Sequence, residues 1–236
     1  MLKEKMHRVV YQIWPRSFMD SNQDGIGDIQ GIISKLDYLK ALGIDILWIS
    51  PLYASPNHDY GYDVSDYYTI NPEFGSMNDF NQLVDACNKH EIDIMMDLVA
   101  NHTSDEHAWF KEALNDLNSS KKDYYFFKDG VNGKEPNNWI SLFGGSAWSK
   151  HDHNQYSLNL FTPSQKDLNW ENSEVREGIY QIIDFWQQKG IKGFRMDVIN
   201  MIAKEKGLPS FDSHKKGYQF AKEYFVSLDQ SHEYLH

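Results

Sequence analysis

GIKGFRMDVIN, residues 190–200, is a β-rich apolar stretch that predicts a strand over residues 191–197. Side chains alternate between the two faces of a strand, so Arg195 and Asp197 share one face while Phe194 and Met196 share the other. A guanidinium beside a carboxylate favours the ionised form and orients it, which suits a nucleophile. A structural ion pair at a strand end explains the same two residues, so the rest of the chain must decide between the two interpretations.

Similar apolar runs predict three earlier strands, over residues 9–14, 44–50 and 92–98. Helical patterns separate them; GIISKLDYLKALG, residues 31–43, puts Ile32, Leu36, Leu39 and Leu42 on one apolar stripe and ends at Gly43. This alternation predicts an α/β fold with a parallel sheet. A closed (β/α)₈ TIM barrel has eight such units, and half a barrel would leave two open edges. We therefore expect the N-terminal half of a TIM barrel, from the N-terminal portion of a longer protein.

The βα rhythm stops after the third strand. Turn-forming residues and short aromatic segments follow, as in SSKKDYYFFKDGVNGKEPNNW, residues 119–139. So many aromatic side chains predict a folded insertion and not a disordered loop. The predicted organisation is three βα units in residues 1–102, a small inserted domain in residues 103–171, and the fourth unit in residues 172–236.

Composition excludes several classes of protein. The formal net charge of the 236-residue chain is -11, which argues against binding to nucleic acid or to anionic membranes. No segment reaches the roughly 18 apolar residues that a membrane span needs, and the first residues do not resemble a signal peptide. The single cysteine, Cys87, fits a reducing compartment, so we expect a cytoplasmic protein. Aromatic residues make up 14% of the chain and suit stacking on sugar rings, although core packing is their commoner use.

The loop DSNQDGIGD, residues 20–28, predicts a metal site. Its oxygen ligands alternate around Gly25 as they do in calcium loops. They are the side chains of Asp20, Asn22, Asp24 and Asp28 and a backbone carbonyl near Ile26. We expect a structural Ca²⁺ or Mg²⁺ here and no organic cofactor; an acidic turn without metal is the alternative.

Polar residues also follow the second and third strands, where the functional groups of a βα barrel gather. Asp59 and Tyr62 bracket Gly61, which allows a carboxylate and a ring to face one sugar. Asp97 falls inside the apolar run MMDLVA, where a carboxylate is usually tied by hydrogen bonds, so we assign it a structural role. His102 is either a ligand-binding donor or a hydrogen-bonded loop histidine, and its spacing does not decide between them.

Taken together, these segments resemble the α-amylase superfamily of glycoside hydrolases, and within it the oligo-1,6-glucosidase and dextran glucosidase branch. The resemblance runs from VVYQIWPRSFMDSNQDGIGDIQGI through DYGYDVSDY, DLVANHTSDEHAWF, FGGSAW and DLNWEN to GFRMDVIN, and so covers nearly the whole chain. It implies a retaining exo-α-glucosidase that removes α-1,6-linked glucose from the non-reducing ends of isomalto-oligosaccharides. The full-length protein would be a monomer with a small oligosaccharide as its partner.

The resemblance also implies roles for individual residues. Asp197 would be the nucleophile and Arg195 would orient it. The terminal glucose would be held by Asp59 and His102 and stacked on Tyr62. The inserted domain would line the pocket with Phe143, Phe161 and Gln165. Val198 matches the small branched residue that this branch associates with α-1,6 linkages.

Three residues depart from the branch: Tyr60 stands where Asn is usual, Asn159 where His is common, and Lys166 where Pro is usual. A retaining glycosidase also needs a second carboxyl group as acid and base. The resemblance places that Glu beyond His236, so we expect the chain by itself to be inactive. Two other interpretations stay open: a trehalose-6-phosphate hydrolase, and a truncated, non-catalytic carbohydrate-binding fragment.

Overall fold

The computed structural model describes residues 7–116 and 118–210, which belong to two compact units. Each unit is assembled from segments that lie apart in the sequence. The first unit consists of Met1–Ala54, Tyr67–Leu98 and Ile182–Arg195. The second unit consists of Ser55–Asp66, Val99–Gln181 and Met196–His236.

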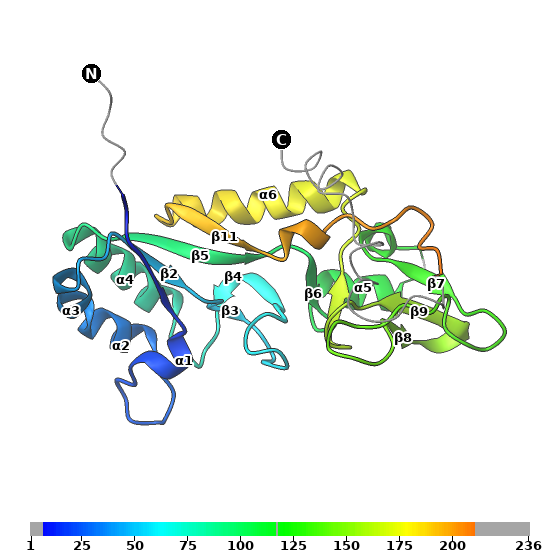
Figure 1. The fold of residues 1–236 in the computed structure, drawn as a ribbon, viewed down its shortest axis with the longest axis horizontal. Helices are drawn as coiled ribbons and strands as arrows, with labels where there is room; N and C mark the ends of the chain where they lie inside the picture. Colours follow the sequence, from blue (N-terminus) through cyan, green and yellow to red (C-terminus); the bar gives the residue numbers. More distant parts are fainter. Residues whose placement is uncertain (1–6, 117, 211–236) are drawn as a thin grey trace, which may run out of the picture. The chain divides into compact units, whose positions relative to one another are not determined.

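A four-stranded parallel sheet with the order β1-β2-β5-β11 forms the centre of the first unit (Figure 1). Its strands are β1 (Val10–Ile13), β2 (Ile46–Ile49), β5 (Asp93–Val99) and β11 (Gly193–Asp197). Val10 pairs with Ile46, and Ile46 pairs with Asp93. Each of the four predicted strands is confirmed to within two residues of its predicted ends.

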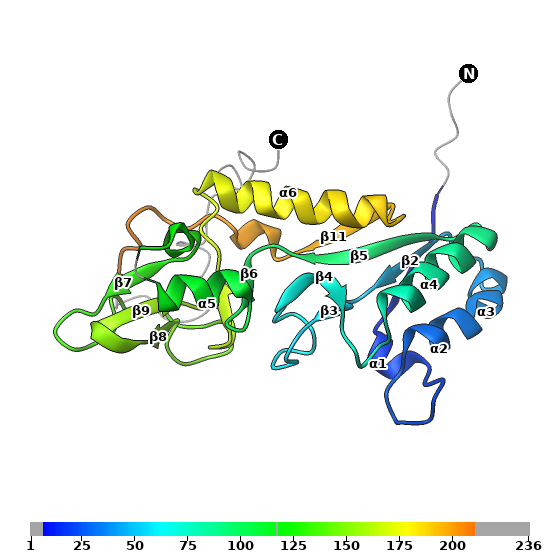
Figure 2. The ribbon, with the colours of Figure 1, turned by 180° about the vertical axis from the view of Figure 1, so that it is seen from behind.

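Helices connect these strands (Figure 2). They are α1 (Pro15–Phe18), α2 (Ile29–Ser34), α3 (Leu36–Ala41), α4 (Met77–Lys89) and α6 (Ser173–Gln188). Ser76 and Asp79 form a capping box at the start of α4, which buries Phe80, Leu83 and Cys87 on one face. A two-stranded sheet of β3 (Tyr53–Ala54) and β4 (Asp66–Ile70) lies between β2 and α4 in the chain. Within the described residues, no helix combines the length and the apolar character needed to cross a bilayer.

The helix predicted over residues 31–43 is wrong as a single element, because it is two short helices that meet at Lys35. The backbone of Lys35 has φ -108° and ψ 5°, and its N–H donates to the carbonyls of Ile32 and Ile33. The apolar stripe still buries Ile32, Leu36 and Leu39, whereas the predicted fourth member, Leu42, is 53% exposed.

Trp186 of α6 organises the aromatic packing of the first unit. The side chain is fully buried and its ring lies edge-on to Phe80 of α4, with centroids 5.0 Å apart. A second edge-on contact joins it to Tyr53 of β3 at 5.6 Å. Its indole N–H donates to the carbonyl of Tyr67 at 2.8 Å, so the one polar atom of this ring is satisfied inside the core.

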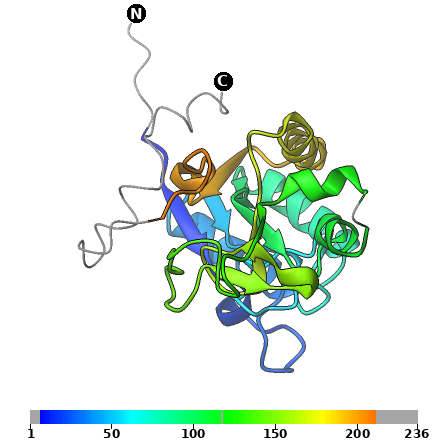
Figure 3. The same ribbon diagram turned by 90° about the vertical axis from the view of Figure 1, so that its right-hand side faces the viewer.

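The second unit contains two antiparallel sheets, drawn in green to yellow-green in Figure 3. The two-stranded sheet pairs β6 (His102–Ser104) with β10 (Gln165–Asp167). The three-stranded sheet has the order β7-β9-β8 and consists of β7 (Phe127–Asp129), β9 (Gln155–Leu158) and β8 (Trp148–Lys150). The helical segments are α5 (Ala108–Asn115) and the 3₁₀ turns η1 (Ser120–Tyr124), η2 (Asp152–Asn154) and η3 (Ile199–Met201).

The second unit contains more than the inserted domain predicted over residues 103–171. It also takes in Ser55–Asp66 and the chain that follows Arg195. The chain after Arg195 belongs to this unit because of its packing. Met201 and Leu208 are buried in one apolar cluster with Trp139, Trp148 and Phe161 of the insertion. The indole N–H of Trp139 also donates to the carbonyl of Pro209 at 2.7 Å. Residues 211–236 of the predicted third segment lie outside the described residues.

His107 begins α5 with an unusual cap that depends on pH. Its Nδ1 accepts a hydrogen bond from the N–H of Trp109 at 3.1 Å, which requires that nitrogen to be unprotonated. Burial lowers the pKa of His107 from 6.5 to about 4, against the opposing charge of Asp66. Below pH 6.5 the unfolded chain therefore binds a proton that the folded chain does not.

We predict that the free energy of unfolding falls as the pH drops from 6.5 to 4, because of His107. In His107→Asn this fall should be smaller by roughly 3 kcal/mol. Asn keeps an acceptor at the cap but does not titrate. The measurement is the free energy of unfolding in urea at pH 7 and pH 4. His153→Asn, at an exposed histidine, is the control and should lose as much stability as the wild type. An equal loss in His107→Asn would contradict the prediction.

Candidate active site

Three of the predicted site residues, Asp59, His102 and Gln165, form one hydrogen-bonded cluster in the second unit. The amide nitrogen Nε2 of Gln165 donates to Oδ2 of Asp59 at 2.9 Å and lies 3.0 Å from Nε2 of His102. Gln165 and His102 are buried, at 0% and 1% exposed. The pairing of β6 with β10 places Gln165 opposite Ser104 and Asp167 opposite His102, which fixes the positions of both side chains.

The orientation of the Gln165 amide is set by Thr162. Both the N–H and the hydroxyl of Thr162 donate to Oε1 of Gln165, at 2.9 and 2.8 Å. The amide nitrogen is therefore the end that faces Asp59 and His102. A donor beside the carboxylate keeps Asp59 available as a hydrogen-bond acceptor.

His102 is neutral in this cluster. Its burial lowers its pKa, although the charges of Asp167 and Asp197 and the carbonyl of Tyr62 act in the opposite direction. Its ring nitrogens contact different residues: Nδ1 lies 3.2 Å from the amide nitrogen of Asn101, and Nε2 lies 3.1 Å from the carbonyl of Tyr62 and 3.0 Å from the amide nitrogen of Gln165. The contact with Tyr62 ties His102 to the loop that carries Asp59.

Asp63, which sequence reasoning did not single out, shapes that loop. The carboxylate is fully buried and accepts hydrogen bonds from the N–H groups of His58 and Asp59, at 2.9 and 3.0 Å. The hydroxyl of Ser55 donates to it as well, at 2.9 Å. Tyr60, at the tip, has φ +52° and is 64% exposed. Asn tolerates this left-handed conformation better than Tyr, so the backbone explains why Asn suits this position and not why Tyr stands here.

Burial raises the pKa of Asp59, and the charges of Asp63 and Asp197 raise it further, while the hydrogen bond from Gln165 lowers it. The charge of Asp197 thus acts on both Asp59 and His102 within the second unit. This brings the predicted nucleophile into the same electrostatic environment as the predicted sugar-binding groups. Tyr62, the predicted stacking residue, is half-buried in the same loop.

Aromatic rings border the cluster. Phe161 is 8% exposed and its ring centroid lies 5.1 Å from that of His102. Phe143 is 63% exposed and contacts Phe161 edge-on at 5.7 Å. The structure therefore brings both predicted pocket phenylalanines to the side of His102.

Val198 has backbone angles of φ 40° and ψ 34°, directly after Asp197. A β-branched residue in the left-handed region is strained, by about 1–3 kcal/mol, and such strain is concentrated at functional sites. Its side chain packs against the cluster that contains Phe161 and Met201.

In the first unit, Arg195 forms an ion pair with Asp97, with Nη1 2.9 Å from Oδ1. Asp97 is fully buried and accepts a further hydrogen bond from the indole of Trp48 at 3.2 Å. The prediction that hydrogen bonds tie Asp97 is confirmed. The predicted roles of Arg195 and Asp197 in catalysis stay predictions.

The other two departures from the branch lie in structural positions. Asn159 is 1% exposed and accepts a hydrogen bond from the hydroxyl of Ser149 at 2.6 Å. Lys166 lies between Gln165 and Asp167 on β10, so its side chain points to the opposite face of the strand. Its ammonium lies 5.4 Å from the ring centroid of Phe110.

The predicted metal loop lies in the first unit, and its carboxylates cap backbone N–H groups. Asp20 accepts from the N–H groups of Gln23 and Gly25, at 2.6 and 2.8 Å, and these bonds lower its pKa. Asp28 caps α2 through the N–H of Gly31 at 2.6 Å. The oxygen donors suit a hard cation in chemical type. No group of three His, Cys, Asp or Glu side chains gathers for a metal within the described residues. The predicted ligands Asn22, Asp24 and Ile26 instead take part in turns of the loop.

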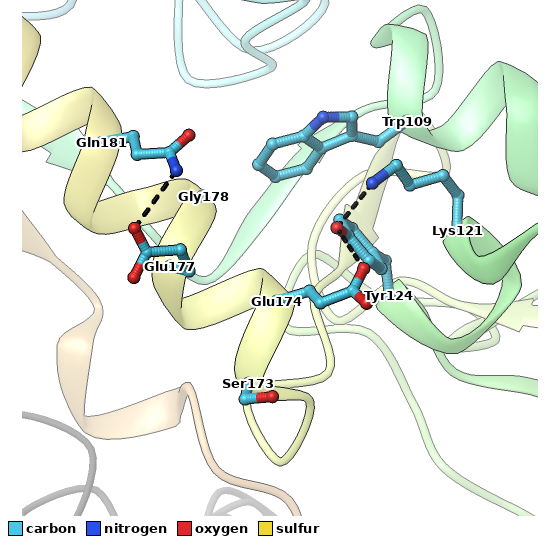
Figure 4. A pocket seen from close by; sticks show the side chains of 8 residues that line it. All are labelled: Trp109, Lys121, Tyr124, Ser173, Glu174, Glu177, Gly178 and Gln181. Carbon is cyan, nitrogen blue, oxygen red and sulfur yellow. Dashed lines mark hydrogen bonds between the residues drawn. The ribbon is translucent and has the colours of Figure 1, made fainter.

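A separate cavity of about 540 Å³ lies between α5, η1 and the start of α6 (Figure 4). Its polar groups are paired with one another: Lys121 donates to the hydroxyl of Tyr124 at 2.5 Å, and that hydroxyl donates to Glu174 at 2.9 Å. Gln181 donates to Glu177 at 3.1 Å. None of the predicted site residues lines this cavity, so we place the candidate active site at the Asp59, His102 and Gln165 cluster.

A parallel βα sheet, followed by a folded insertion that carries a polar, aromatic-bordered cluster, is the arrangement of a barrel glycosidase. The sequence model of the alpha amylase catalytic domain matches residues 12–236. The chain belongs to this family, and its fold corresponds to the N-terminal portion of that TIM barrel.

Individual relatives lie within this family. An oligo-1,6-glucosidase of Bacillus cereus is 54% identical over 229 residues, which is 97% of this chain and 41% of that protein. A trehalose-6-phosphate hydrolase of Bacillus subtilis is 49% identical over 97% of this chain and 40% of its own length. The crystal structure of an isomaltulose synthase from Klebsiella sp. LX3 matches with a TM-score of 0.92 and 48% identity, over 96% of this chain and 41% of that one. The chain thus spans about two fifths of the length of these relatives.

We predict that Gln165→Met weakens substrate binding by the full-length protein. Loss of the amide donor removes the interaction that lowers the pKa of Asp59, so the carboxylate becomes protonated at higher pH. KM should rise about tenfold, and the acid limb of kcat/KM should move to higher pH.

The measurement is kcat/KM across pH for the wild type, Gln165→Met and a control, Gln181→Met. Gln181 is exposed and donates to Glu177, so its loss should leave the acid limb in place. An unchanged acid limb in Gln165→Met would show that Asp59 does not govern binding.

Proposed function

We propose that the full-length protein is a retaining exo-α-glucosidase that removes α-1,6-linked glucose from the non-reducing ends of isomalto-oligosaccharides. The observation that carries this proposal is the hydrogen-bonded cluster of half-buried Asp59 with buried Gln165 and His102, in which the charge of Asp197 acts on the pKa of both Asp59 and His102. The family membership and the oligo-1,6-glucosidase relatives support an α-glucosidase.

The roles of the residues follow from their chemistry. Asp59 would accept hydrogen bonds from sugar hydroxyls, and Gln165 holds its carboxylate in place for this. The neutral ring of His102 would offer a polar edge beside the aromatic wall of Phe161, while Tyr62 would stack on the sugar. Asp197 would attack the anomeric carbon and form a covalent glucosyl-enzyme, oriented by Arg195.

Water would then release glucose with retention of the anomeric configuration, which needs a second carboxyl group as acid and then base. We propose that this group is a Glu on the next strand of the full-length protein. Val198, the residue after the proposed nucleophile, matches the small branched residue that the resembled branch associates with α-1,6 over α-1,4 linkages. We also propose that the protein is a cytoplasmic monomer, in which the single cysteine, Cys87, is a buried thiol.

A trehalose-6-phosphate hydrolase is the second candidate, because a protein of that name is 49% identical to this chain. We predict that the full-length protein releases glucose from isomaltose and panose at least tenfold faster, by kcat/KM, than it cleaves trehalose 6-phosphate. The reversed preference would replace the proposed substrate with the phosphorylated one.

Asp197→Asn is the matched variant in the same assay, because it keeps the size of the side chain and removes the attacking carboxylate. We expect it to lower kcat by about 10⁴-fold or more. Binding of isomaltose by the wild type without any glucose release would favour the non-catalytic carbohydrate-binding interpretation.

We propose that residues 20–28 hold a structural Ca²⁺ or Mg²⁺, on the strength of their oxygen donors, of which those of Asn22 and Asp24 are exposed. Removal of the metal with EDTA should then lower Tm by several degrees, and added Ca²⁺ should restore it. Asp24→Asn removes one charged ligand and should make Tm much less sensitive to Ca²⁺. A Tm that neither EDTA nor Ca²⁺ changes would mean that the loop is stabilised by its own hydrogen bonds.

A further inference from the structure

Lys204 is a buried charge that the sequence did not single out. Its side chain is 1% exposed, and its ammonium lies 3.0 Å from Oδ1 of Asp167, whose carboxylate is fully buried. The same ammonium donates to Oδ1 of Asn101 at 2.8 Å and to the carbonyl of Met201. A lysine is very rarely buried to this extent without a specific partner.

Lys204 is linked to the candidate active site by a continuous set of contacts within the second unit. Asn101 accepts from Lys204 and donates to Asp167 at 2.9 Å, and its amide nitrogen lies 3.2 Å from Nδ1 of His102. On β10, Asp167 lies on the same face of the strand as Gln165, two residues earlier. The buried ion pair thus contacts Asn101, which in turn contacts His102.

The other end of this arrangement is the turn that follows Asp197. Val198 is in the left-handed region, and its carbonyl accepts from the N–H of Met201 at 2.8 Å. The carbonyl of Met201 in turn accepts from Lys204. A strained turn persists only where its surroundings hold it, and the Lys204 ammonium fixes this one from within the protein.

We propose that Lys204 is a positioning residue for the nucleophile: its ion pair with Asp167 holds the turn after Asp197 against the strand that carries Gln165. This inference rests on the proposed function, since it assigns Lys204 to the reaction of Asp197. Lys204 itself does not touch substrate. An ammonium suits the position because it can bind a carboxylate, an amide oxygen and a carbonyl at once.

The test uses the full-length protein and two variants at the ion pair. Lys204→Met alone leaves the Asp167 carboxylate buried without its cation, so it should lower Tm strongly. The double variant Lys204→Met with Asp167→Asn removes both charges at similar volume and keeps one acceptor oxygen for the N–H donors at Asp167, so it should recover part of that Tm. Comparison of the two variants therefore separates an effect on the position of Asp197 from an effect on folding.

Lys166→Met is the matched control. Lys166 is also a buried lysine, adjacent to Asp167 in the chain, but it points to the other face of β10, beside Phe110. We expect the double variant to lose about 100-fold in kcat with less than a threefold change in KM, because misplacement of a reacting group costs rate more than binding. Lys166→Met should keep kcat within threefold of the wild type.

The assay is run on whichever of isomaltose, panose and trehalose 6-phosphate the wild type cleaves, so an error in the proposed substrate shows in the wild type alone. If the wild type cleaves none of them, the proposed function and the role of Lys204 in it both fail. A folded double variant with wild-type kcat would overturn the proposal for Lys204 alone. So would an equal loss of kcat in Lys166→Met, because the effect would then follow from any buried charge on or near β10.

Discussion

The buried carboxylate of Asp167 is the interaction on which the rest of the second unit depends. One of its oxygens accepts from the N–H of Leu160 at 2.7 Å, and the other binds Asn101 and Lys204. These partners come from three separate segments of the chain: the end of the insertion, the end of β5 and the turn after β11. A carboxylate removed from water requires such partners, so the three segments meet at Asp167 in the folded unit.

Burial also determines the protonation and hydrogen bonding of the residues in the candidate active site. A histidine enclosed by Phe161 and by buried strands is neutral, and its two ring nitrogens are held by contacts with Asn101, Gln165 and Tyr62. Asp59 lies nearer to solvent, and the hydrogen bond from Gln165 opposes the rise of its pKa that burial causes. A polar surface of fixed donors and acceptors, bordered by aromatic rings, suits a neutral, hydroxyl-rich ligand.

Sequence patterns predicted the strands well, because a buried parallel strand must be a short apolar run. The chain contains four such runs, and helical segments separate them. The patterns failed at Lys35, because the apolar stripe continues across the residue where the backbone interrupts the helix. Among the site residues, Asp59 and His102 were candidates from their place after the second and third strands, Gln165 came from the family resemblance alone, and the three do form one cluster. Lys204 carried no such signal, since MIAKEKG resembles an exposed charged loop and only the tertiary structure buries its first lysine.

Strain at Val198 and the buried charges near it have a common explanation. A turn after Asp197 without backbone strain would not need an ion pair to hold it. A buried ion pair can often be replaced by apolar residues of similar volume with little loss of stability, so stability alone does not explain Lys204 and Asp167. The chain instead combines a left-handed β-branched residue with a buried ammonium that binds the carbonyl of the same turn. Both features limit the conformations open to Asp197, which is the last residue of β11 and directly precedes the turn. The proposed nucleophile, which would have to reach one carbon atom of a sugar, benefits from that limit more than the fold does.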